Sequence, residues 1–148
     1  IYYIDSRDYR TIWSNPPGEY EHITCQSVFN TDDDPQPELL FCADGYLIVY
    51  DGRDQYEQWR SDQSNLTARQ LLIGDVDGDG EKEIVLNDGY VFDARFFDLE
   101  WQSPEPFGER LGLLDMDEDG ILELIGEFQG RYLRVFDVDL RREKSLAR

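Results

Sequence analysis

A nine-residue acidic pattern that occurs twice limits the possible folds of this chain more than any other feature. Residues 75–83 read Asp-Val-Asp-Gly-Asp-Gly-Glu-Lys-Glu, and residues 115–123 again place acids at positions 1, 3, 5 and 9 and glycine at position 6. Residues 30–38 form a degraded copy, in which Asn30 replaces the first acid and Pro35 replaces the glycine. The copies start 45 and 40 residues apart, so the sequence predicts a protein built from internal repeats.

A second landmark recurs with a similar period. In it, an apolar or aromatic residue precedes an aspartate, and a tryptophan follows the aspartate by eight positions. The examples are Asp5 with Trp13, Asp51 with Trp59, and Asp93 with Trp101, while Asp137 is followed at that spacing by Ser145. The fixed place of the tryptophans in the repeat favours packing between neighbouring repeats over a platform for stacking sugars.

Short apolar and β-branched segments surround each acidic loop. In the second copy they are residues 70–74 before the loop, 83–87 after it, and 90–92 beyond a glycine-containing turn. None of them has helical length or a period of 3.6 residues, which predicts strands. Four short antiparallel strands in each unit of 40–46 residues are typical of a β-propeller blade. A β-sandwich would explain the strands but not the repeated loops, so we predict an all-β fold of propeller blades.

The repeats divide the chain into four predicted units, about three and a half blades in all. Residues 1–20 would hold the outer strands of a first blade, and residues 21–63 a blade with the degraded loop. Residues 64–105 and 106–148 would each hold a blade with an intact loop. Propellers close with about 4–8 blades, so we expect further blades or several copies to complete a ring. The chain opens on Ile1, which indicates a removed signal segment or a piece of something longer.

The acidic loops predict a binding site for a hard cation. Alternating side-chain oxygens in a tight loop, with a backbone carbonyl and a further carboxylate, suit Ca²⁺ better than the geometrically stricter Mg²⁺. The second loop offers Asp75, Asp77, Asp79, Glu83 and the carbonyl of Glu81. The third loop offers Asp115, Asp117, Asp119, Glu123 and the carbonyl of Ile121. The degraded first loop offers the weaker candidates Asn30, Asp32, Asp34, Gln36 and Glu38.

Two other interpretations of the loops fit the sequence less well. An EF-hand needs an acid at loop position 12 and flanking helices, whereas position 12 is Phe41, Leu86 or Gly126 and the flanks read as strands. Solvated turns are also rich in Asp and Gly. Two nine-residue loops with matching acid positions are less readily explained as solvated turns.

The charge balance excludes several classes of function. The chain has 33 acidic residues against 14 Lys and Arg, a net charge of −19, whereas nucleic-acid binding needs basic residues against the phosphates. The longest apolar runs have five residues, and a membrane-spanning helix needs about 20. His22 is the only histidine, so a catalytic triad would rest entirely on it, and we expect no enzyme. The alternative is a non-catalytic or catalytic propeller part of a larger polysaccharide-active enzyme, because so acidic a chain can hold a carboxylate pair for glycoside hydrolysis, although the recognisable carboxylates belong to the acidic loops.

The cysteines and the basic end of the chain give two smaller predictions. Cys25 lies five residues before the first loop and Cys42 lies four residues after it, which makes them expected cross-strand neighbours, either as thiols or as a disulfide. The basic end consists of Arg141, Arg142, Lys144 and Arg148. We expect it to be a solvated tail or a link to a further segment.

The loops and their flanking strands resemble the FG-GAP and VCBS-type repeats of integrin α-subunit propellers and their bacterial relatives. Phe107-Gly108 resembles the FG of that name, and residues 113–117 come after it as in the family. The resemblance implies that each loop joins the two innermost strands of a blade and binds Ca²⁺. It also implies a secreted or cell-surface protein that recognises a protein or glycan ligand in adhesion or acts as a scaffold.

Overall fold

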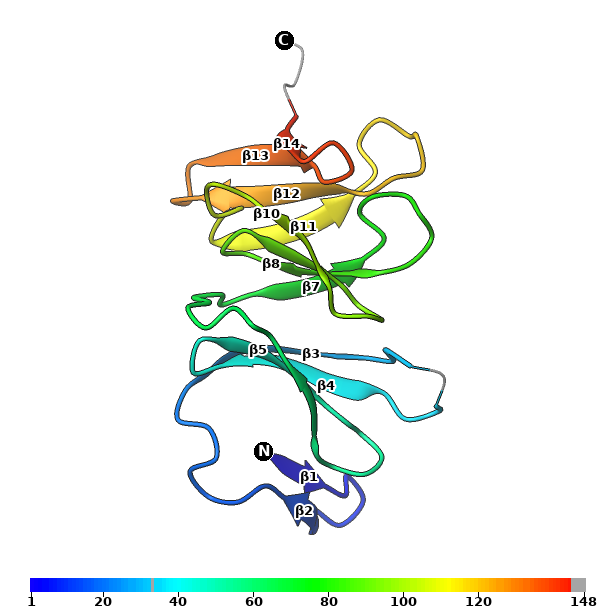
Figure 1. The fold of residues 1–148 in the computed structure, drawn as a ribbon, viewed down its shortest axis with the longest axis vertical. Helices are drawn as coiled ribbons and strands as arrows, with labels where there is room; N and C mark the ends of the chain where they lie inside the picture. The colour runs from blue at the N-terminus through cyan, green and yellow to red at the C-terminus, as the bar shows by residue number, and fades with distance from the viewer. Residues whose placement is uncertain (33, 145–148) are drawn as a thin grey trace.

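The computed structural model describes residues 1–32 and 34–144, which are built from β-strands and their connections (Figure 1). No described residue is helical, so within these ranges no helix is long and apolar enough to cross a membrane. Fourteen strands of the described residues form a two-stranded sheet and three four-stranded sheets. All pairings are antiparallel, which confirms the all-β fold class and the four-stranded units.

Each strand of a sheet pairs with the next strand in the chain. The first sheet contains β1 (Tyr2–Ile4) and β2 (Thr11–Ser14). The second contains β3 (Ile23–Phe29), β4 (Glu38–Ala43), β5 (Tyr46–Tyr50) and β6 (Glu57–Arg60). The third contains β7 (Leu71–Gly74), β8 (Glu83–Leu86), β9 (Tyr90–Asp93) and β10 (Leu99–Gln102). The fourth contains β11 (Arg110–Leu114), β12 (Glu123–Phe128), β13 (Tyr132–Asp137) and β14 (Arg142–Glu143).

The middle strands of the second sheet are buried on both faces. Leu40 and Leu47 pack toward the third sheet, whereas Phe41 and Ile48 pack toward the first, and none of the four is more than 1% exposed. A strand covered on both faces needs a nearly continuous apolar run. This burial accounts for the two five-residue apolar runs of the sequence, which form β4 and β5.

The sheets are stacked in chain order, with the first hairpin and the last strand at opposite ends (Figure 1). The first strands of the four-stranded sheets are neighbours, because β7 contacts both β3 and β11. One apolar cluster, which includes Leu47 and Phe92, joins the second sheet to the third. Another, which includes Val85 and Phe136, joins the third sheet to the fourth.

Each tryptophan packs on an aromatic ring of the next sheet or of the segment leading to it. The ring centroids of Trp13 and Tyr50 are 5.6 Å apart, and those of Trp59 and Phe92 are 6.2 Å apart. Trp101 lies 5.1 Å from Phe107, in the connection between β10 and β11. The prediction that the tryptophans pack between repeats is confirmed.

The connection between the third and fourth sheets passes very close to β12. An ideal Cβ on Gly126 would lie 1.6 Å from the carbonyl oxygen of Phe107, so glycine is required at this crossing. The fully buried side chain of Phe107 then lies between Trp101 and Phe136, with both ring centroids 5.1 Å away. The phenylalanine of the FG pair is therefore a core residue that joins two sheets.

Cys25 and Cys42 are register partners on β3 and β4, and both are buried free thiols. This register confirms that they are cross-strand neighbours. The hydrogen bond with Cys25, together with burial, raises the pKa of the Cys42 thiol.

Candidate metal centres

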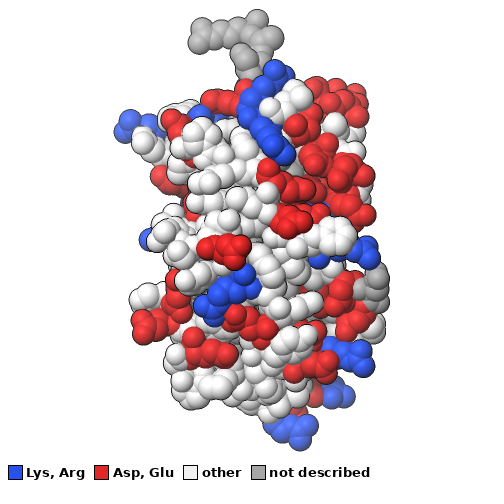
Figure 2. All heavy atoms as spheres, viewed as in Figure 1, with Lys and Arg blue, Asp and Glu red and all other residues white. Residues whose placement is uncertain are grey.

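The three acidic loops lie along one edge of the stack. They connect β3 to β4, β7 to β8, and β11 to β12, and all project on the right of Figure 1. Acidic side chains gather along the same side in the space-filling view (Figure 2). Neighbouring loops also touch, because an ideal Cβ on Gly78 of the second loop would lie 2.7 Å from the side chain of Ile121 in the third.

The last residue of each loop is a buried glutamate that begins the second strand of its sheet. These residues are Glu38, Glu83 and Glu123, exposed by 1%, 1% and 4%. One carboxylate oxygen of each accepts the backbone N–H of the second loop residue. The donors are Thr31 at 2.6 Å, Val76 at 2.7 Å and Met116 at 2.6 Å. The repeat therefore fixes one glutamate oxygen in the same way three times.

Two aspartates join this glutamate in each intact loop. Carboxylate oxygens of Asp75, Asp77 and Glu83 lie within 4.8 Å of one another, and Asp115, Asp117 and Glu123 form the same arrangement. We refer to these groups as the second and third clusters. The predicted ligands at loop positions 1, 3 and 9 are thus brought together.

The aspartates at position 5 lie outside these clusters and shape the loop instead. The Oδ1 atom of Asp79 accepts the backbone N–H of Glu81 at 2.8 Å, and Asp119 accepts that of Ile121 at 2.9 Å. Such bonds from an aspartate to the backbone two residues later are common in turns. Gly80 and Gly120 come next with φ near +95° and +93°, a conformation that favours glycine.

The first loop assembles a different set of acids. Its cluster, which we call the first cluster, contains Asp32, Glu38 and Asp51. The predicted ligand Asn30 instead donates its side-chain amide to the Asp34 carbonyl oxygen at 2.6 Å. The Oδ1 atom of Asp34 accepts the N–H of Gln36 at 2.7 Å. Asn30 and Asp34 are therefore turn-forming residues here.

Asp51 is a member of the first cluster that the loop pattern does not predict, although its position is a repeat landmark. It comes directly after β5, the third strand of the second sheet. In each four-stranded sheet, the pairing of the second and third strands places the landmark aspartate beside the glutamate that ends the loop. The register makes Glu83 and Asp93 direct partners and continues the same pattern at Glu123 and Asp137. The loop pattern combined with strand register would indicate that Asp51 and Asp137 lie beside the glutamates of the first and third loops.

Burial and the proximity of other acids dominate the electrostatics of the second cluster. The Oε1 atom of Glu83 is buried and accepts no hydrogen bond from the described residues. Burial, with smaller contributions from Asp77, Glu100 and Asp75, raises the pKa of Glu83 to about 8. Burial and neighbouring acids also raise the pKa values of Asp77 and Glu100. A buried oxygen without a donor among the described residues, facing two aspartates, is an arrangement that a hard cation can bind.

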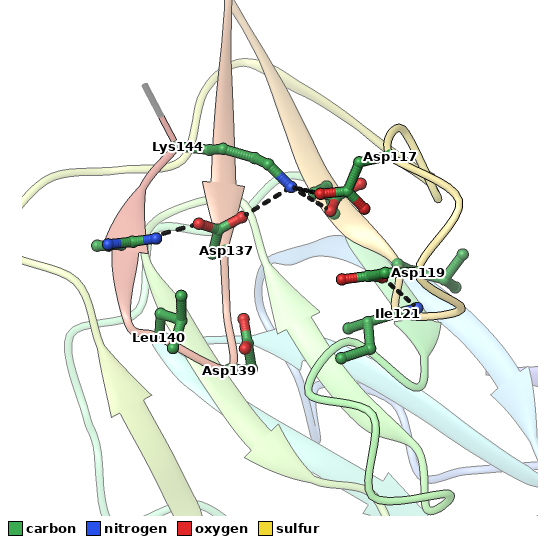
Figure 3. A pocket seen from close by; sticks show the side chains of 10 residues that line it. Asp117, Asp119, Ile121, Asp137, Asp139, Leu140 and Lys144 are labelled. Carbon is green, nitrogen blue, oxygen red and sulfur yellow. Dashed lines mark hydrogen bonds and ion pairs between the residues drawn. The ribbon is translucent and has the colours of Figure 1, made fainter. Parts of the chain in front are cut away.

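The third cluster differs because a lysine reaches into it (Figure 3). Lys144 Nζ lies 2.6 Å from Asp117 Oδ2, 2.7 Å from Glu123 Oε1 and 3.3 Å from Asp137 Oδ1. Its hydrogen bonds lower the pKa of Asp117 and raise that of the Lys144 ammonium. The negative charge of this cluster is therefore offset by the chain itself.

The prediction that the basic end is a solvated tail is wrong for Lys144, whereas its alternative, a link to a further segment, stays a prediction. Lys144 enters the third cluster, and Arg142 Nε lies 3.2 Å from the buried carboxylate of Asp137. The cause is the turn after β13, which returns β14 alongside it and brings these cations back to the acidic loop. Arg148 lies outside the described residues.

No family model, curated protein or solved structure matches the chain. The resemblance to FG-GAP and VCBS-type repeats therefore rests on the chain's own residues and stays a prediction.

Proposed function

We propose that the chain is a calcium-binding β-propeller repeat module that serves extracellular recognition of a protein or glycan, or acts as a scaffold. The observation that carries the proposal is the second cluster, where the buried Glu83 carboxylate faces Asp75 and Asp77 with one oxygen unpaired among the described residues. Glu83 is held in position by the Val76 N–H, so its free oxygen is preorganised.

The donor set favours a hard divalent cation. All members of the three clusters are carboxylates, with no histidine or cysteine among them. Oxygen-only donors suit Ca²⁺, Mg²⁺ or Mn²⁺, and an irregular loop that can add backbone carbonyls favours the flexible coordination of Ca²⁺. When bound, the ion would supply positive charge between the acids of the second cluster.

The stacking of the sheets supports the assignment as propeller blades. Adjacent first strands, loops on one edge and a tryptophan between successive sheets are the features expected of blades around a common axis. The β1–β2 hairpin then corresponds to the outer two strands of a blade, because it carries Asp5 and Trp13 at the positions of Asp51 and Trp59.

Calcium should stabilise the protein through the second cluster. At ten to a hundred times the dissociation constant, one site adds about 1.4–2.7 kcal/mol, which raises the melting midpoint by about 3–10 °C for a chain of this size. We expect Asp77→Asn to lose most of this gain. The measurement is thermal melting with excess Ca²⁺ and with chelator.

Asp98→Asn is the matched control, because Asp98 is an exposed aspartate of the same sheet, before β10. It should keep the full calcium response. A wild-type midpoint that is the same with Ca²⁺ and with chelator would show that the loops are ordinary solvated turns.

The blade assignment also predicts self-association. The N-terminal hairpin exposes Ile4 and Ile12 by 54% and 66%, and Val28 nearby by 61%. Tyr3, Ile12, Val28 and Leu39 line one apolar hollow there. Exposed apolar surface beside a strand edge invites pairing with another chain, so a second copy should cover it.

Light scattering over a wide concentration range should give masses rising above the 17.4 kDa of one chain. Ile12→Asp should return the mass toward that of one chain, because a buried unpaired carboxylate opposes association. A constant monomeric mass in the wild type would contradict this expectation.

A further inference from the structure

Equivalent oxygen atoms have opposite surroundings in the second and third clusters. Glu83 Oε1 is buried without a donor among the described residues, whereas Glu123 Oε1 lies 2.7 Å from the ammonium of Lys144. In each case the other oxygen of the glutamate accepts the N–H of the second loop residue. At the third cluster, the ammonium therefore occupies the position in which a cation would contact the glutamate of the second cluster.

Lys144 is held there by its backbone as well as by its side chain. Its N–H donates to the carbonyl oxygen of Val135 at 2.7 Å, which continues the pairing of β14 with β13. The side chain, 22% exposed, reaches across a cavity of about 170 Å³ to Asp117, Glu123 and Asp137 (Figure 3). These three contacts come from different elements, namely the loop, β12 and β13.

The surrounding charges explain why a cation is needed at this position. Five acids line the cavity, and Lys144 and Arg142 are the cations that line it within residues 1–32 and 34–144. The acids are Asp117, Asp119, Glu123, Asp137 and Asp139. Arg142 forms its ion pair with Asp137. Lys144 is the cation that contacts both the loop and its buried glutamate.

We propose that Lys144 is an internal cation of the third cluster, so that its ammonium and a divalent cation compete for Asp117 and Glu123. This inference rests on the proposed function, because it assumes that the second cluster binds Ca²⁺. Two cations cannot share the same carboxylate oxygens without strong mutual repulsion. Occupancy of the third cluster would therefore detach Lys144 and loosen the short strand β14 from β13.

The decisive experiment measures calcium binding at the third cluster alone. Asp32→Asn and Asp77→Asn together weaken the first and second clusters, and this double variant is the reference for calorimetric titration with Ca²⁺. Adding Lys144→Gln should raise the remaining affinity by about tenfold, the order of magnitude for losing competing charge-assisted hydrogen bonds. Adding Asp117→Asn to that triple variant should abolish the gain.

Arg131→Gln is the matched control for net charge. Arg131 is an exposed residue of the turn between β12 and β13, at the far end of β12 from the third cluster. In the reference background it should leave the calcium affinity unchanged. An equal gain from Arg131→Gln and Lys144→Gln would overturn the proposal, because overall charge would then explain the effect.

A chemical measurement reports on the lysine itself. Lys82 and Lys144 are the only lysines of the chain, and Lys82 is exposed. In the reference background, acetylation monitored by mass spectrometry should modify Lys144 more slowly than Lys82 without metal. Saturating Ca²⁺ should increase the Lys144 rate severalfold and leave the Lys82 rate unchanged.

The outcomes separate this inference from the proposed function. If Asp77→Asn removes calcium binding from the wild type but Lys144→Gln adds none to the reference, competition by Lys144 is wrong and the function stands. If neither the wild type nor any Lys144→Gln variant binds Ca²⁺, both proposals are wrong. A Lys144 acetylation rate that saturating calcium does not change would also contradict the proposed competition.

Discussion

Replacing Phe107 by alanine should destabilise the protein by about 3–5 kcal/mol, the range for a buried phenylalanine reduced to alanine. Its ring is fully buried and lies between Trp101 of the third sheet and Phe136 of the fourth. The surrounding cluster also includes Val85. Because Gly126 and the Phe107 backbone are already in close contact, the connection cannot move inward to fill the cavity.

Thermal or urea unfolding in excess Ca²⁺ measures this effect. The expected loss corresponds to a fall of roughly 6–20 °C in the melting midpoint. Phe96→Ala is the control, since Phe96 is 69% exposed in the turn between β9 and β10. It should change the stability by no more than about 0.5 kcal/mol. Equal effects of the two substitutions would show that Phe107 does not join the sheets.

The strands could be predicted because the same strand pattern recurs along the sequence. Segments expected at residues 70–74, 83–87 and 90–92 became β7, β8 and β9 with ends differing by one residue. Glycine-containing turns mark the ends of these segments, and the aspartate–tryptophan landmark gives the period of the repeat. The landmark also located Trp59 and Trp101, whose packing on aromatic rings is consistent with their constant place in the repeat.

The composition of the candidate sites was only partly predictable. Residues within one loop, such as Asp77 and Glu83, are brought together by local chain geometry that the pattern itself encodes. Asp51 and Asp137 depend on strand register, which the loop pattern does not contain. Lys144 lies 21 residues after Glu123, and its contact depends on the return of β14 along β13. Such a contact leaves no periodic signal, so the sequence alone favours a solvated tail.

Replacing Glu83 by glutamine should remove the pH dependence that this residue gives to the stability of the metal-free protein. Burial raises the pKa of Glu83 from 4.5 to about 8. Between these two pH values, the folded state therefore keeps a proton on Glu83 that the unfolded state has lost. Stability is then lost as pH rises through this interval. Glutamine has no proton to lose, and its amide can donate to the neighbouring aspartates while its oxygen still accepts the Val76 N–H.

In chelator, the stability of Glu83→Gln relative to wild type should therefore increase between about pH 5 and pH 9 by on the order of 2–4 kcal/mol. Urea unfolding at several pH values measures the difference. Glu81→Gln is the control, because Glu81 is an exposed acid of the same loop, and its difference from wild type should not depend on pH. Parallel profiles for wild type and Glu83→Gln would contradict the prediction.

Calcium should invert this behaviour in the wild type. The ion and the proton compete for the same carboxylate, so binding requires the deprotonated form and releases a proton below the pKa. The stabilisation by Ca²⁺ should accordingly be greater at about pH 8 than at about pH 6, whereas Glu83→Gln should respond little at either value. Because the metal-free wild type is least stable where the metal binds best, calcium has its largest effect on folding above neutral pH. A calcium response that is equal at both pH values would show that Glu83 is not a ligand.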